Sequence, residues 1–166
     1  MAGITVAVLI ADQVTKSLVA AGRIPDGSSL GSLTVRVVRN HGASGDILSG
    51  YPILVTVAAL VITALAAAFA VRVSGRGAAL CLAAVLGGAL GNLADRLFRS
   101  PGLGRGGVVD WIHLSFAGGG SLDLADLAIQ FGVLGAIAAM LVARPAAGRD
   151  SRSQPIEADG STNGTT

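Results

Sequence analysis

The feature that most constrains this chain is the stretch at residues 51–71, "YPILVTVAALVITALAAAFAV", which contains no charged side chain. A helix needs roughly 20 apolar residues to cross a bilayer, and this stretch is long enough. Only 13% of the 166 residues are charged, well below the share typical of a soluble domain. Aromatic residues make up 4%, so the apolar character comes from small and aliphatic side chains, which let helices pack closely in lipid. We therefore expect an integral membrane protein.

Three further stretches predict membrane spans, at residues 4–21, 77–94 and 127–143. The first contains Asp12 and Lys16, which are four residues apart and can pair on one helix face. A cleaved signal peptide is the alternative for this stretch, because residues 20–22 are small. A signal peptide begins with basic residues, whereas no Lys or Arg precedes Asp12. We expect a retained helix, and so an all-α integral membrane fold with four transmembrane helices.

The segments between the spans are uneven in length. Residues 23–50 and 99–121 are long loops, whereas residues 72–76 form a short link. Residues 32–39, "SLTVRVVR", are β-branched and partly alternating, which predicts a strand. Residues 1–144 are expected to form one membrane domain. Residues 145–166 are polar and contain Gly, Ser and Pro, which predicts a disordered tail.

Four spans place both termini on one side of the membrane and both long loops on the other. Because the link between Arg72 and Arg76 is short and basic, we place it and the termini in the cytoplasm. The third span then rises to the outer face and ends in a polar group: Asn92, Asp95 and Arg96. Asp110 lies in the outer loop that follows, and Asp126 begins the descent of the fourth span. These side chains are predicted to meet near the outer surface.

A polar cluster at the edge of a bilayer, contributed by separate elements, indicates a functional site. The simpler interpretation is that Asp123 or Asp126 only caps the fourth helix. The sequence offers no metal-ligand spacing and no phosphate-binding glycine loop, and Cys81 stands alone in an apolar run, so neither metal nor cofactor is expected. Two close Asp residues can share a proton, which suits peptide hydrolysis by an aspartic dyad.

Five short motifs carry a resemblance to a known family: "DQVTK" at 12–16, "NHGAS" at 40–44, "GGALGNLADR" at 87–96, "VVDWI" at 108–112 and "LADLAI" at 124–129. In this order, and on these spans, the chain resembles the bacterial lipoprotein signal peptidases (signal peptidase II), which are membrane aspartic proteases. The resemblance implies four helices and a small extracytoplasmic β-cradle, to which the strand at 32–39 can belong. It also implies removal of the signal peptide from a prolipoprotein, cut just before a diacylglyceryl-modified cysteine.

The same resemblance assigns the catalytic pair to Asp110 and Asp126. It matches further positions to supporting or substrate-binding roles, namely Asp12, Lys16, Asn40, Asn92, Asp95 and Arg96. The implied partners are lipidated prolipoprotein signal peptides and membrane lipid, with the enzyme acting as a monomer. The net charge of +2 is spread along the chain, so no nucleic acid is expected. The implied location is the bacterial cytoplasmic (inner) membrane, with the site near its extracytoplasmic face and the tail in the cytoplasm.

The chain departs from the family pattern at two positions. Gly45 stands where the family has an aromatic residue, and Asp123 stands where the family has Asn. Asp123 is three residues before Asp126, so their carboxylates can come close. We expect Asp123 to cap the fourth helix and not to act as a third catalytic acid.

Two other functions start from other residues. "GASG" at 42–45 is similar to the serine motif of rhomboid proteases, in which Ser44 would need His41 or His113 as a base. A four-helix transporter would instead use Asp12 inside the first span. The transporter leaves the outer polar group without a role, and Ser44 falls in a polar loop instead of a span.

Overall fold

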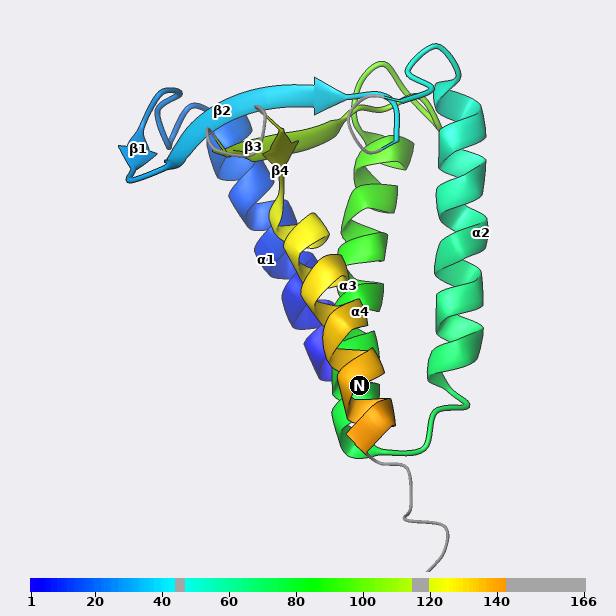
Figure 1. The fold of residues 1–166 in the computed structure, drawn as a ribbon. Helices are drawn as coiled ribbons and strands as arrows, with labels where there is room; N and C mark the ends of the chain where they lie inside the picture. The colour runs from blue at the N-terminus through cyan, green and yellow to red at the C-terminus, as the bar shows by residue number, and fades with distance from the viewer. Residues whose placement is uncertain (44–46, 115–119, 143–166) are drawn as a thin grey trace, which may run out of the picture.

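The computed structural model describes residues 1–43, 47–114 and 120–142, which form four long helices and one small sheet (Figure 1). The helices are α1 (Ala2–Ala20), α2 (Pro52–Ala70), α3 (Arg76–Phe98) and α4 (Leu124–Val142). All four are long and apolar enough to cross a bilayer, which confirms the four predicted spans. Large apolar side chains on their outer surfaces, such as Leu60, Leu65 and Phe131, are exposed, as contact with lipid requires.

Two helix ends differ from the prediction, and both differences concern polar residues. α3 continues to Phe98, so Asp95 and Arg96 lie inside the helix and not at its end. α4 begins at Leu124, so Asp126 lies within its first turn. The apolar stretches alone set the predicted ends. The charged residues Asp95, Arg96 and Asp126 can lie within α3 and α4 because their side chains have polar or charged partners inside the protein.

α3 lies at the centre of the helical arrangement and contacts each of the other three helices. Glycines allow its closest approaches. A side chain at Gly88 would place its Cβ 2.5 Å from the carbonyl oxygen of Ala125 on α4. One at Gly91 would collide with the Asp12 carboxylate of α1. In Figure 1, α1, α3 and α4 form a group, and α2 stands to one side of α3.

The sheet lies across one end of the helices (Figure 1) and has four antiparallel strands in the order β1-β2-β3-β4. They are β1 (Ser29–Leu30), β2 (Leu33–Asn40), β3 (Val108–Leu114) and β4 (Ser121–Leu122). β2 confirms the predicted strand. The connection at residues 99–121 contains a strand that was not predicted, β3, which pairs with β2 along most of its length. The β-branched and aromatic sequence "VVDWIHL" carried that signal.

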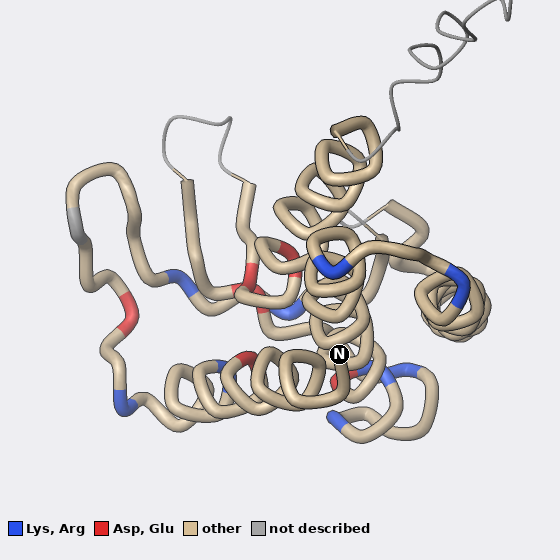
Figure 2. The backbone as a smooth tube through the Cα atoms, turned by 90° about the horizontal axis from the view of Figure 1, so that it is seen from below, with Lys and Arg blue, Asp and Glu red and all other residues tan. Residues whose placement is uncertain are grey.

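Both long connections lie at the sheet end, whereas the N-terminus, the end of α4 and the short link before α3 lie at the opposite end (Figure 1). This agrees with the predicted even number of crossings. The predicted tail at 145–166, Ser44 and Gly45 lie outside the described residues. Figure 2 shows that acidic positions lie close together in the middle of the molecule, between the helices.

Candidate active site

Asp110 is held on β3 by its neighbours in the sheet. It is directly opposite Val38 of β2, and its side chain is 3% exposed. Its Oδ2 accepts a hydrogen bond from Nδ2 of Asn40, at the end of β2, over 3.2 Å. Asn40 Oδ1 accepts the backbone N–H of Gly42 at 3.0 Å, so the amide is fixed with its donor toward Asp110. Among the residues the structure describes, Asp110 Oδ1 is buried without a hydrogen-bond partner.

Asp126 is held in a similar way from the helices. Its Oδ1 accepts a hydrogen bond from Nδ2 of Asn92 on α3, at 3.0 Å. Asn92 Oδ1 accepts one from Lys16 Nζ on α1, at 2.9 Å, which orients that amide. Each of the two acids therefore receives one amide N–H from an asparagine that is itself fixed by a second hydrogen bond.

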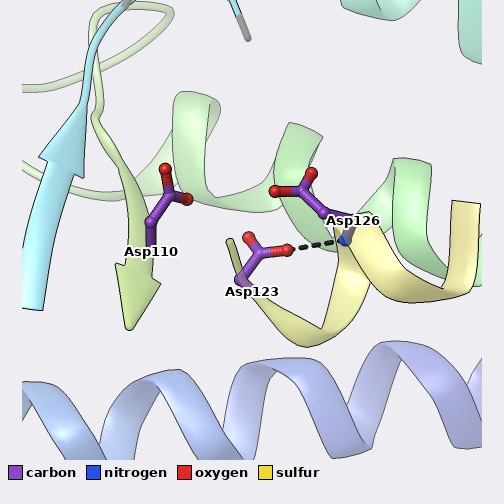
Figure 3. Close-up of side chains that lie close together, drawn as sticks. All are labelled: Asp110, Asp123 and Asp126. Atoms are coloured by element: carbon purple, nitrogen blue, oxygen red, sulfur yellow. Dashed lines mark hydrogen bonds between the residues drawn. The ribbon is translucent and has the colours of Figure 1, made fainter. Parts of the chain in front are cut away.

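The third acid, Asp123, caps α4. Its Oδ1 accepts the backbone N–H of Asp126 at 2.7 Å, which is the usual geometry of an N-cap carboxylate (Figure 3). Its Oδ2 lies 2.7 Å from Lys16 Nζ. The predicted cap is present, and both oxygens of Asp123 are occupied by these contacts. Figure 3 shows Asp110 and Asp126 reaching toward each other from the strand and the helix, with Asp123 beside them.

Lys16 lies at the centre of a buried group of three carboxylates, which we call the Lys16 cluster (Lys16, Asp12, Asp95 and Asp123). Its Nζ lies 2.9 Å from Asp12 and 3.1 Å from Asp95, and all four side chains are fully buried. The predicted pair of Asp12 and Lys16 is therefore present. A buried lysine needs such partners because an uncompensated charge in this environment is very costly.

The acids of the Lys16 cluster also bind backbone N–H groups next to Asp110 and Asp126. Asp12 Oδ1 accepts the N–H of Ala125 at 3.0 Å, so two carboxylates satisfy the first turn of α4. Asp95 Oδ2 accepts the N–H of Val109, the residue before Asp110, at 3.2 Å. The Lys16 cluster thus holds in place the backbone beside Asp110 and the backbone beside Asp126.

Asp110 and Asp126 open onto a cavity of about 450 Å³ between α2, α3, α4 and the sheet. One wall is apolar and comes mainly from α2 (Leu54, Val55, Ala58, Ala59 and Ile62). The opposite wall, toward the sheet, is polar (Asn40, Asn92, Arg96, Asp110, Ser121 and Asp126). The cavity can hold an extended, largely apolar chain whose polar backbone reaches the two acids.

Arg96 supplies the positive charge at the polar wall. It is 7% exposed, and its Nη2 donates to the carbonyl oxygen of Gly42 at 2.7 Å. Its Nη1 is buried and has no hydrogen-bond partner in the described part of the chain. Arg96 interacts electrostatically with Asp110 and Asp126, so it partly offsets the two negative charges of the site.

Burial and, next, repulsion from the Asp126 carboxylate raise the pKa of Asp110 to about 6, against the hydrogen bond from Asn40. Burial likewise raises the pKa of Asp123 to about 7, against the attraction of the Lys16 ammonium. Asp110 can therefore carry a proton near neutral pH, as one member of a proton-sharing pair must.

A metal ion has one conceivable place among the described residues. An oxygen from each of Asp110, Asp123 and Asp126 lies within 4.8 Å of the other two. Both oxygens of Asp123 are already used, one on a backbone N–H and one on Lys16. The donor set for a hard cation is therefore incomplete, and the arrangement fits a proton-sharing pair better than a metal centre.

The remaining candidates from the sequence lie away from this group. His41 Nδ1 is 3.3 Å from the carbonyl oxygen of Arg105, and His113 Nδ1 is 3.3 Å from Ser121 Oγ. Cys81 is a free thiol on α3, beside Gly135 of α4.

Sequence reasoning missed two residues of the buried network. Gln13 Nε2 donates to both Asp12 and Asp95 at 3.1 Å, and Arg99 pairs with Asp95 one helical turn away. The spacing of Asp95 and Arg99 was a usable signal, since residues four apart on a helix are neighbours. Gln13 gave none, because its partners on α3 are 78 and 82 positions away.

Comparison with known proteins agrees with this arrangement. A family model described as "Signal peptidase (SPase) II" matches residues 4–142. A lipoprotein signal peptidase of Leifsonia xyli subsp. xyli is 34% identical over 135 residues, which are 79% of this chain and 62% of that protein. One from Mycobacterium tuberculosis is 37% identical over 117 residues, or 68% of this chain and 57% of that protein. The chain thus spans about three fifths of the length of these relatives.

Solved structures give the same picture of the fold. A bacterial membrane enzyme solved by the in meso method at 2.3 Å has a TM-score of 0.73 and 26% identity, covering 91% of this chain and 92% of its own. A second, solved at 1.9 Å, has a TM-score of 0.69 and 28% identity, covering 85% and 92%.

Proposed function

The chain belongs to the signal peptidase II family, and on that premise we propose that it is an aspartic endopeptidase of prolipoproteins. It removes the signal peptide by cutting before the diacylglyceryl-modified cysteine. Its substrates, its catalytic pair and its orientation in the membrane are all part of this proposal. Membership of this family does not favour a rhomboid-like serine protease using Ser44, or a transporter.

The observation that carries the proposal is the pairing of Asp110 and Asp126 over one cavity. They come from a strand and a helix, and their carboxylates approach within 4.8 Å. Each is held by an asparagine amide, Asn40 or Asn92. Neither is in an ion pair with a Lys or Arg within the described part of the chain. Both remain available to exchange protons, as an aspartic dyad requires.

The mechanism follows from two carboxylates that share one proton. The ionised carboxylate takes a proton from a water molecule, whose oxygen attacks the carbonyl carbon of the scissile peptide. The neutral carboxylate donates its proton to the carbonyl oxygen, and a tetrahedral diol forms. Collapse of the diol returns one proton to the dyad, and the departing nitrogen takes the other as the C–N bond breaks. The raised pKa of Asp110, about 6, supports a neutral acid in the resting pair.

The position of the pair suits a lipidated substrate. Asp110 and Asp126 lie at the sheet end of the helices, and the cavity beneath them is walled by the apolar residues of α2. A peptide anchored in lipid can keep its apolar segment against this wall while its scissile bond stays near water. In this proposal residues 1–144 are the peptidase domain, and residues 23–50 and 99–121 are its outer loops.

The proposed function includes a membrane location, an orientation and an oligomeric state. The sheet end faces the extracytoplasmic side of the bacterial cytoplasmic membrane. Both termini, with a tail at 145–166, lie in the cytoplasm. The enzyme works as a monomer in contact with lipid.

The test is cleavage of a diacylglyceryl-modified prolipoprotein peptide by the purified full chain in detergent. We expect one cut before the modified cysteine by the wild type, and none by Asp110→Asn or Asp126→Asn. Phe131→Leu is the matched control, because Phe131 lies in α4, is 69% exposed and does not line the cavity. A wild type that leaves this peptide intact, or a cut that persists in either Asp variant, overturns the proposal.

A further inference from the structure

One polar side chain in the membrane-spanning part of α4 is left unexplained by the dyad. Gln130 is exposed, and it lines the same cavity as Asp126, four residues earlier. Residues four apart lie on one face of a helix, so both side chains face the cavity. A polar side chain at this depth is costly in lipid and is retained where it has a partner or a function.

The side chain of Gln130 has no hydrogen-bond partner among the residues that the structure describes. None of the hydrogen bonds among residues 1–43, 47–114 and 120–142 involves its side-chain amide. Thr63, on the wall that α2 contributes, is another polar residue of the cavity. The Thr63 hydroxyl donates to the carbonyl oxygen of Ala59 at 2.7 Å, one turn earlier in its own helix. The Gln130 amide is therefore the uncommitted hydrogen-bonding group on this part of the wall.

A substrate in this cavity needs such a group. A peptide is cleaved by an aspartic dyad in an extended form, because a helix hides its carbonyl carbons behind its own hydrogen bonds. Unwinding leaves backbone N–H and C=O groups without hydrogen-bond partners, and lipid offers no such partners. A glutamine amide offers both a donor and an acceptor and can satisfy one residue of an extended chain in both directions.

The depth of Gln130 indicates which substrate residue it meets. Four residues of helix put it about 6 Å deeper than Asp126 along α4. An extended chain covers that distance in about two residues. The side of the substrate that lies deeper is the signal peptide itself, since its apolar segment occupies the bilayer.

We infer that Gln130 is a substrate-binding residue that hydrogen-bonds the main chain of the signal peptide about two residues before the scissile bond. This inference rests on the proposed function. It adds Gln130 as a residue that binds the backbone of the substrate and not its side chains. Because the Gln130 amide forms no hydrogen bond within the described part of the chain, it can rotate onto the substrate. It would hold the peptide in register with Asp110 and Asp126.

The test combines Gln130→Met, which keeps the length of the side chain, with substrates carrying one backbone ester. Four lipidated peptides each have one amide of the signal-peptide side replaced by an ester, from the first to the fourth bond before the scissile bond. An ester lacks the N–H donor and has a weaker carbonyl acceptor. Phe131→Leu is the control, since it changes the lipid-facing side of the same helix turn.

For the all-amide peptide we expect Gln130→Met to lower kcat/KM about 5- to 10-fold, the effect of one hydrogen bond. In the wild type, one ester near the second bond should give a similar loss, and in Gln130→Met that ester should give no further loss. Equal sensitivity of both enzymes to all four esters overturns the inference. So does full activity of Gln130→Met. If the wild type cuts none of the peptides, the proposed function has failed first.

Discussion

Two groups of carboxylates lie side by side at the sheet end of this protein, and their surroundings differ. The Lys16 cluster holds three acids on one ammonium group, with every member fully buried. Asp110 and Asp126 lie next to it, face a cavity, and receive only neutral amide donors from Asn40 and Asn92. The Lys16 ammonium offsets part of the negative charge of the first group, whereas neither acid of the second group forms an ion pair with Lys or Arg among the described residues.

The difference assigns two tasks to residues of the same type. Acids of the Lys16 cluster bind the backbone N–H groups of Val109, Ala125 and Asp126, which lie at or next to the two cavity acids. A carboxylate whose oxygens are held by a lysine and by backbone N–H groups is a good structural support and a poor acid–base catalyst. We therefore expect substitutions in the first group to affect folding, and substitutions in the second to affect turnover.

The largest effect is expected at the cavity acids. Asp110→Asn and Asp126→Asn should each lower turnover at least about 10³-fold, because Asn keeps the shape of Asp but cannot exchange a proton. Both variants should still accumulate in the membrane. Turnover per folded molecule is the measurement, and a value near that of the wild type in either variant contradicts the comparison.

The next effect is expected at the cation that separates the two groups. Lys16→Met removes the ammonium that three buried carboxylates share, and only Asp95 keeps a second cationic partner, Arg99, among the described residues; the change should destabilise the fold by about 3–5 kcal/mol. The measurement is thermal unfolding in detergent. The double variant Lys16→Met/Asp123→Asn should recover part of the loss, since one uncompensated charge is removed. A double variant no more stable than the single one argues against charge balance as the function of Lys16.

A smaller effect is expected at Asp123, which touches both groups. Asp123→Asn keeps an oxygen for the N–H of Asp126, while Lys16 keeps Asp12 and Asp95, so most turnover should remain. Removing a negative charge beside Asp126 makes the neighbouring carboxylates easier to ionise. In the wild type, the Asp110 pKa of about 6 predicts that kcat/KM falls as the pH rises above about 6. In Asp123→Asn this fall should begin at a lower pH.

The measurement for Asp123 is kcat/KM against pH for the wild type and this variant. A well-folded Asp123→Asn without turnover would mean that the reacting pair includes Asp123.

The smallest effect is expected from metal removal. The three neighbouring carboxylates lie within 4.8 Å of one another, but Asp123 has no free oxygen for a metal. Treatment with a chelator should leave turnover unchanged. A loss that added divalent metal restores would show that these acids bind an ion and are not a proton-sharing pair.

Much of this arrangement was predictable from local sequence. Long, mostly apolar runs predict the four helices, because crossing lipid requires both length and internal hydrogen bonding. The four-residue spacing of Asp12 and Lys16 predicts their pair, and the position of Asp123 before an apolar run predicts its cap. In each case the cause acts within one helix turn.

What the sequence did not predict depends on contacts between distant segments. β3 was not predicted, and its pairing with β2 joins residues about 70 positions apart. Asp12 binds Ala125 across 113 positions, and no local pattern signals it. Asn92, Asp95 and Arg96 were all expected to meet Asp110 and Asp126 near the outer surface. The structure brings Asn92 and Arg96 to the cavity and turns Asp95 toward α1.

The central claim is that Asp110 serves the reaction and Asp95 serves the fold. The direct test is thermal unfolding of Asp110→Asn and Asp95→Asn beside the wild type at pH 7 in one detergent. The raised pKa of Asp110 means that its charge destabilises the folded state as pH rises from about 4 through about 6. Asp110→Asn should therefore melt at or above the wild-type temperature, and Asp95→Asn, which loses contacts to Lys16 and Arg99, should melt clearly below it. The opposite order, with Asp110→Asn unstable and Asp95→Asn unchanged, would contradict the account.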